Sequence, residues 1–200
     1  NTKDITLESA QQFSKIIHQA GTVVWNGTMG VFEAPPNDQG TRIIATAIKA
    51  GRAEGDTIRA ATDSMTTLNR WACEAMQELE IRAATDITGF GLLGHLRQML
   101  RVSGVSATLD SSSLPFLPGV DELAEVERFP GGTVRNLEDV SVDVSFPEEM
   151  PEHRRLLMAD AQTSGGLLMA VDSETLPELL SRLEGRAPVA EVIGRLEEGP

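Results

Sequence analysis

The chain has 200 residues, which is enough for one ordinary domain, or for one domain and a short additional segment. Its composition, 40% hydrophobic and 24% charged, is typical of a globular protein, and no apolar run approaches the ~18 residues that a membrane span requires. The net charge of −13 argues against nucleic acid as a partner, because an acidic surface repels phosphate backbones.

The start of the chain and its single cysteine bear on processing and location. The first residue is Asn1 and no signal peptide follows, so we interpret the start as a cut or processed end. Cys73 cannot form an internal disulfide, which favours the reducing cytoplasm. Its apolar neighbours have helical spacing and no histidine lies nearby in sequence. We therefore expect a buried thiol and not a nucleophile.

The first forty residues contain a helix, a strand and a loop by their patterns. Apolar residues recur at helical spacing over 6–20, and a β-branched run at 22–25 predicts a buried strand. A glycine loop follows at 26–30. Residues 34–40 form the strongest cluster of helix and strand breakers in the chain. We expect a domain boundary there.

The remaining 160 residues alternate between helical and extended patterns, which predicts a mixed α and β fold, α/β in the broad sense. The predicted helices are 41–50, 56–79, 95–102 and 173–183. The predicted strands are 81–87, 105–109, 140–146, 167–171 and 189–193, with a proline-rich turn at 114–119.

The stretch TVVWNGTMGVFE, residues 22–33, is a strand that runs into a glycine loop. Strand ends of this kind bind nucleotides in α/β sheets, although a strand followed by a plain turn is the simpler interpretation. The stretch resembles the WNGPxGVFE signature of phosphoglycerate kinase. The resemblance implies that Asn26 and Glu33 contact a nucleotide, Glu33 through the ribose. Thr28 stands where that family usually has proline.

This resemblance covers about a fifth of the chain. The glycine-rich GGGDT phosphate loop of the kinase is absent from the sequence, and residues 54–57 are better interpreted as a helix start with Asp56 as its cap. The catalytic and substrate-binding domain of the kinase is missing as well. Phosphoglycerate kinase activity is not expected.

A second candidate site lies where the predicted strand 81–87 ends. Asp86 is followed by three glycines, Gly89, Gly91 and Gly94, before a predicted helix. Glycines permit close approach of a ligand, and free amides at a helix start attract phosphate. An aspartate there is a suitable ligand for Mg²⁺, which prefers one or two carboxylates together with phosphate oxygens.

The same three glycines admit two other interpretations. Their G-x-G-x-x-G spacing, with Asp110 about 20 residues further on, fits a dinucleotide-binding turn. An ionised Asp86 beside a pyrophosphate argues against it, unless a cation lies between them. A strand-to-helix packing turn without any ligand is the third possibility. Spacing alone ranks the nucleotide site and the packing turn about equally.

Four blocks in order carry a more specific resemblance. They are SMTTLNR at 64–70, TDITGFGLLGH at 85–95, PGGTVRN at 130–136 and DAQTSGGLL at 160–168. They resemble blocks of selenophosphate synthetase (selenide, water dikinase), which belongs to the superfamily of aminoimidazole ribonucleotide synthetase. The match covers about four fifths of the chain. Ala161 stands where the family usually has proline.

The resemblance implies a carboxy-terminal domain of that family and a reaction of ATP, selenide and water that gives selenophosphate, AMP and phosphate with Mg²⁺. It assigns Asp86 as a metal ligand, and Asp160 is a weaker candidate that would otherwise cap a turn. We expect a structural hydrogen bond from His95, and surface positions for His18 and His153. The residues implied to face the cofactor or its cleft are Thr85, Asp86, Gly89, Gly91, Gly94, Arg135 and Asn136.

The resemblance also implies that catalytic parts are missing. The family's reactive cysteine or selenocysteine, a lysine and further aspartates belong to an amino-terminal domain that has no match here. We expect a fragment over 1–40 joined to a domain over 41–200, a chimera that is inactive alone and that pairs with an absent domain or forms a homodimer. The alternative is a non-catalytic folded module.

Overall fold

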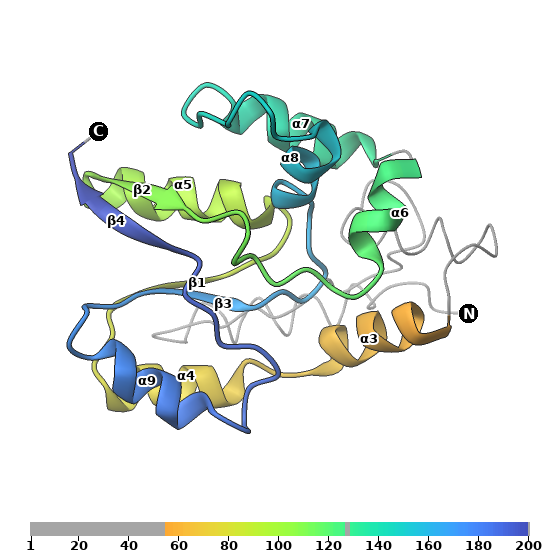
Figure 1. The fold of residues 1–200 in the computed structure, drawn as a ribbon. Coiled ribbons are helices and arrows are strands. Elements are labelled where there is room, and N and C mark those ends of the chain that lie inside the picture. The colour runs from red at the N-terminus through yellow and green to blue at the C-terminus, as the bar shows by residue number, and fades with distance from the viewer. Residues whose placement is uncertain (1–54, 127–128, 200) are drawn as a thin grey trace, which may run out of the picture.

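The computed structural model describes residues 55–126 and 129–199 (Figure 1). The predicted helices at 6–20 and 41–50, the strand at 22–25 and the boundary at 34–40 lie outside these residues. Within the described part, helices and strands alternate along the chain, which confirms the mixed α and β class. The elements are α3 (Gly55–Thr66), α4 (Arg70–Glu78), β1 (Ala83–Asp86), α5 (Gly91–Ser103), β2 (Val105–Leu109), α6 (Val120–Val126), α7 (Gly131–Val140), α8 (Glu152–Met158), β3 (Leu167–Ala170), α9 (Leu176–Leu183) and β4 (Gly194–Glu198).

The four strands form two antiparallel pairs. β1 pairs with β3, so that Asp86 at the end of β1 lies opposite Leu167 at the start of β3. β2 pairs with β4, and Val105 lies opposite Glu198. In Figure 1 the β1–β3 pair lies between α5 and the two neighbouring helices α4 and α9. Each strand of the central pair therefore leads from one helical layer toward the other.

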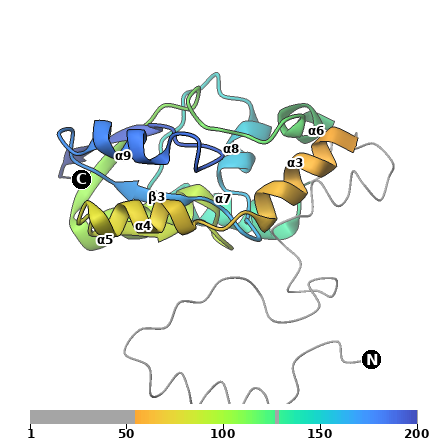
Figure 2. The ribbon, with the colours of Figure 1, turned by 90° about the horizontal axis from the view of Figure 1, so that it is seen from below.

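Three groups of buried apolar side chains hold the layers together. One joins α3, α6 and α8 through Ala61, Ala124 and Leu157; Figure 2 shows α3 reaching toward α6. A second joins α5, α7 and α8, with Val140 at its centre. The third packs α4 against α9 through Ala75. The second group matters most for the site, because it fixes α5, α7 and α8 relative to one another.

The predicted helix at 56–79 is wrong, because the structure breaks it into α3 and α4. Thr66 and Thr67 donate side-chain hydrogen bonds back to the carbonyls of Thr62 (2.9 Å) and Asp63 (2.7 Å). Such bonds compete with the helical ladder. Asp56, predicted as a cap, lies in the first turn of α3, and its carboxylate pairs with Arg59.

The strands at 81–87, 105–109 and 167–171 and the helix at 173–183 are confirmed within a few residues as β1, β2, β3 and α9. The predicted strand at 140–146 is wrong, because α7 ends at Val140 and no strand follows it before α8. The last strand lies at β4, later than the predicted 189–193. Helix α5 begins at Gly91, four residues before its predicted start. Helices α6, α7 and α8 were not predicted.

No helix in the described ranges is long and apolar enough to cross a membrane.

Two valines of the false strand offer a test of the core. Val140 is 1% exposed and packs among α5, α7 and α8, whereas Val142 is 81% exposed. We expect Val140→Ala to lower the free energy of unfolding by about 2 kcal/mol, since it leaves a cavity in a packed site. The matched variant Val142→Ala should change it by less than about 0.5 kcal/mol. Urea unfolding followed by circular dichroism measures both, and equal losses would contradict this placement of α7.

Candidate nucleotide site

Two loops meet where β1 ends. The first, residues 87–90, connects β1 to α5 and is called the glycine turn below. The second, residues 160–166, connects α8 to β3 and is called the QTSGG loop. Three backbone hydrogen bonds join them: Ile87 N–H to Gly166 O (3.0 Å), Gly165 N–H to Ile87 O (3.1 Å) and Gln162 N–H to Thr88 O (2.9 Å). Segments more than 70 residues apart in sequence are therefore joined by backbone hydrogen bonds beside the end of β1.

The three glycines after β1 differ in whether a side chain would fit in their place. Gly91 has a φ of +66°, and a Cβ there would lie 2.5 Å from the carbonyl carbon of Ala159. A Cβ on Gly94 would lie 2.6 Å from the Cβ of Phe90. Only Gly89 faces open space, with no atom within 4 Å of a built Cβ. Packing therefore requires Gly91 and Gly94, while Gly89 is the glycine that an incoming ligand can approach.

The dinucleotide interpretation is wrong. A dinucleotide fold needs parallel neighbouring strands joined through the helix, but β1 and β2 lie in different sheets and each pairs antiparallel with another strand. Asp110, the predicted ribose ligand, accepts hydrogen bonds from the hydroxyls of Ser112 (2.6 Å) and Ser113 (2.9 Å) instead. These bonds lower the pKa of its carboxyl.

Asp86 stands at the end of β1 and is half-buried. In the described part of the chain, no hydrogen bond or ion pair to its carboxylate is found, so its oxygens remain available to a ligand. The hydroxyl of Thr85 lies 3.2 Å from the backbone oxygen of Asp86 and does not engage the carboxylate. The nearest charge effect is on His95, whose imidazolium form Asp86 favours.

His95 has the structural role expected of it. Its Nε2 lies 3.1 Å from the backbone N–H of Thr88 and accepts that hydrogen bond, and the Thr88 hydroxyl lies 3.2 Å away. The acceptor role requires a neutral ring. Burial lowers the pKa of His95, an effect that Asp86 partly opposes. His95 thus secures the glycine turn to the first turns of α5.

Asp160 is the first residue of the QTSGG loop and is only 8% exposed. The hydroxyl of Thr133 on α7 donates to its carboxylate, and the backbone of Ala161 also contributes a hydrogen bond. Burial raises the pKa of Asp160 to about 7, although both hydrogen bonds act in the opposite direction. A carboxyl so enclosed supports the loop and is poorly placed as a metal ligand.

Two asparagines from the matched blocks hold the loops from outside. Asn69 donates through Nδ2 to Gly165 O at 2.9 Å, and Asn136 donates to Gly89 O at 2.9 Å. Arg135, predicted to face the same cleft as Asn136, is exposed. Asn69 and Thr133 were not singled out in the sequence, because their partners lie 96 and 27 residues away and leave no local pattern.

Other predicted residues lie away from this site. His153 is only partly at the surface: its side chain is 19% exposed, and Nε2 lies 3.6 Å from Asp121 Oδ1. Cys73 was expected to be a buried thiol; it is half-buried on α4 and accepts a weak hydrogen bond from Gln77 at 3.7 Å. His18, Asn26 and Glu33 lie outside the described residues.

The side chains at the end of β1 can hold a metal ion only together with ligands from another molecule. Residues 55–126 and 129–199 contain no group of three or more His, Cys, Asp or Glu side chains that would hold a metal alone. Asp86 offers one free carboxylate. Mg²⁺ is commonly bound through one or two carboxylates together with phosphate oxygens and waters. The site therefore suits Mg²⁺ carried by a nucleotide better than a dedicated metal centre.

A cavity of about 890 Å³ lies nearby but is a different feature. It is lined mainly by apolar side chains of α5, β2, β3 and α9, and it reaches the QTSGG loop from behind. Neither Asp86 nor Gly89 lines it. Its lining is mainly apolar, although it includes Arg186 and Arg195, and it lacks the open carboxylate of Asp86. The polar end of β1 is therefore the better candidate for a nucleotide that carries Mg²⁺.

Most of the chain matches a known family of domains. Residues 38–200 match the family described as AIR synthase related protein, C-terminal domain. The match includes all the described residues up to the end of β4, and with them both loops. The chain belongs to this family of carboxy-terminal domains.

Similar proteins carry a more particular name. The chain is 43% identical over 162 residues to selenide, water dikinase of Myxococcus xanthus, a match that covers 80% of this chain and 46% of that protein. It is 41% identical over 155 residues to the protein of the same name from Carboxydothermus hydrogenoformans, covering 78% and 45%. It is 42% identical over 157 residues to the protein of that name from Porphyromonas gingivalis, a match that covers 78% of this chain and 44% of that protein. The chain thus matches less than half the length of these relatives.

The buried carboxyl predicts a pH dependence of stability. Because the pKa of Asp160 is raised from 3.8 to about 7 in the folded state, the folded chain binds more protons than the unfolded chain between these values. This contribution to stability is fully present below pH ~4 and is lost as the pH rises through about 7. Asp160→Asn should remove that loss, which amounts to at most ~4 kcal/mol. Urea unfolding at pH 4 and pH 8 spans this range, and an unchanged pH dependence in the variant would contradict the assignment.

Proposed function

We propose that this chain is the carboxy-terminal domain of a selenophosphate synthetase and that it contributes part of a Mg²⁺–ATP site. The reaction is that of ATP, selenide and water to give selenophosphate, AMP and phosphate. Three observations support the proposal: the family match over residues 38–200, the relatives named selenide, water dikinase, and the free carboxylate beside the glycine turn.

Asp86 carries the proposal. Its carboxylate lies at the end of β1 without a described partner, and Gly89 leaves open space beside it. Helix α5 begins next to them, and its N-cap Phe90 makes no side-chain cap hydrogen bond. The amide of Gly91 already donates to Thr88 O (3.0 Å), so the amides that follow it in the first turn are the ones proposed to meet an anion. Mg²⁺ bound to the phosphates would neutralise their charge, while Asp86 and the turn orient them. Thr85 and Gly89 are the other contacts expected there.

The rest of the reaction needs groups beyond these residues. By family resemblance, the reactive cysteine or selenocysteine, its lysine and further aspartates belong to the half of the relatives that the chain does not match. A separate domain would supply them, because a second copy of this chain lacks the same groups. We infer a cytoplasmic setting from the single cysteine. A phosphoglycerate kinase-like fragment over 1–40, with nucleotide contacts at Asn26 and Glu33, remains part of the proposal, as does the domain division at 40–41.

Calorimetric titration of Mg²⁺–ATP tests the site. We expect the 200-residue chain to bind, and Asp86→Asn to weaken binding about tenfold or more, a loss of about 1.4 kcal/mol. Asp110→Asn is the matched control, because Asp110 ends the other early strand and its carboxylate is already occupied by Ser112 and Ser113. Absent binding, or equal binding by wild type and Asp86→Asn, would favour the non-catalytic module.

Turnover is a separate question from binding. With ATP, Mg²⁺ and selenide, the chain alone is expected to make no selenophosphate. By family resemblance, the reactive cysteine or selenocysteine and its lysine belong to the half of the relatives that the chain does not match. Phosphorus NMR of the reaction mixture measures this directly. A selenophosphate signal above the level of a protein-free control would overturn the expectation.

A further inference from the structure

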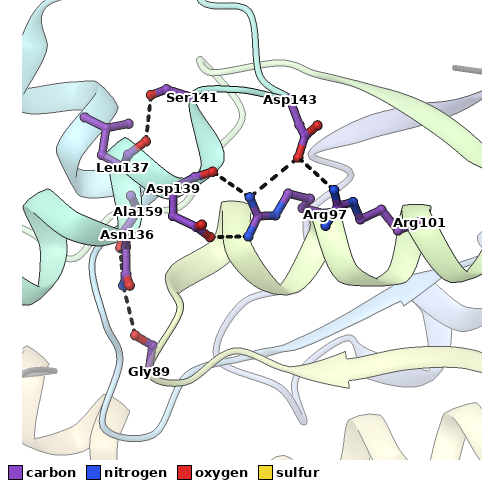
Figure 3. A network of polar contacts seen from close by, with 9 residues as sticks. All are labelled: Gly89, Arg97, Arg101, Asn136, Leu137, Asp139, Ser141, Asp143 and Ala159. Carbon is purple, nitrogen blue, oxygen red and sulfur yellow. Dashed lines mark hydrogen bonds and ion pairs between the residues drawn. The ribbon is translucent and has the colours of Figure 1, made fainter.

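The side chain of Asn136 on α7 bridges the two sides of the site. Its Nδ2 donates to Gly89 O at 2.9 Å and to Ala159 O at 3.1 Å (Figure 3). A primary amide has two N–H donors, so both are used. One carbonyl belongs to the glycine turn, and the other lies just before the QTSGG loop. A single side chain thus fixes the distance between them.

Because of its location, the Asn136 bridge affects the position of the glycine turn. Gly91 packs so tightly on Ala159 that no Cβ fits between them, which leaves the two backbones in direct contact. Two carbonyl oxygens directed at one point repel each other unless a donor lies between them. Asn136 supplies that donor at Gly89, three residues after Asp86. Movement of Gly89 would therefore shift the turn that places Asp86 beside the start of α5.

A second contact secures the same helix independently. Asp139, one turn further along α7, pairs with Arg97 on α5, and the Arg97 guanidinium also donates to Asp139 O at 2.6 Å. Asp143 lies 3.5 Å from the same guanidinium (Figure 3). These ion pairs attach α7 to the side of α5, away from the glycine turn. They hold the helix in place without touching either loop.

We propose that Asn136 is a positioning residue for the Mg²⁺–ATP site: it sets the spacing between the glycine turn and the QTSGG loop and thereby the affinity for the nucleotide. This rests on the function proposed above. It differs from a purely structural contact, because loss of the Asn136 bridge should weaken nucleotide binding more than loss of the Asp139 pair on the same helix.

The test compares isosteric changes at the two positions. Asn136→Asp replaces both donors with oxygen and places a carboxylate against two carbonyls. Asp139→Asn removes the charge that pairs with Arg97 and leaves the bridge intact. At pH 8, calorimetry is expected to give a Mg²⁺–ATP dissociation constant about tenfold higher for Asn136→Asp and within about twofold of wild type for Asp139→Asn. Hydrogen exchange should quicken in both loops for Asn136→Asp alone.

The possible outcomes separate this inference from the proposed function. If wild type binds Mg²⁺–ATP and Asn136→Asp binds it equally well, the inference is wrong and the proposed function stands. If both variants weaken binding alike, Asn136 is only one of several structural contacts, and the inference is again wrong. If wild type does not bind, the proposed function fails and takes the positioning role with it. Should Asn136→Asp not fold, Asn136→Ala, which removes the donors without adding charge, makes the same comparison.

Discussion

The arrangement of the described helices and strands depends on one close backbone contact, which the glycine turn and the start of α5 make with the end of α8 and the QTSGG loop. Gly91 and Gly165 are the residues that permit it: a side chain on Gly91 would meet Ala159, and one on Gly165 would lie 2.3 Å from the carbonyl oxygen of Ile87. Because neither has a Cβ, the glycine turn and the QTSGG loop approach closely enough for backbone hydrogen bonds. The β1–β3 ladder continues directly from these bonds. The end of α8 and the start of α5 are brought together by the same contact.

This contact also separates two carboxyls that the sequence places in similar motifs. Asp160 is buried within one of the two contacting loops, where burial raises its pKa and the hydroxyl of Thr133 donates to its carboxylate. Asp86 lies beside the contact, half-buried and without a described donor. An enclosed carboxyl costs free energy when it is charged, so it serves best as a hydrogen-bonding support. Only the carboxyl beside the contact is free to bind a cation, and this makes Asp86 the stronger metal candidate of the two.

The sequence predicted those parts of the fold that have local causes. The short apolar runs of β1, β2 and β3 were found because β-branched and apolar residues mark strands locally. The alternation of apolar and polar residues at 140–146 predicted a strand that does not form. Val140 is buried as the last residue of a helix, and Val142 is exposed beyond it. Contacts such as those of Asn69 and Thr133 could not be predicted, because distant parts of the chain supply their partners.

The glycines after Asp86 have different structural reasons, although they form one sequence motif. Of the three glycines after Asp86, two are explained by packing alone, since Gly91 has a positive φ against Ala159 and Gly94 lies against Phe90. Their presence would be required even if the domain bound nothing, so they cannot count in favour of a nucleotide. What packing leaves unexplained is the open space at Gly89 next to a carboxylate without a partner. Asp86 and Gly89 are therefore the residues that support the proposed nucleotide site, and the other glycines of the motif shape the backbone beside them.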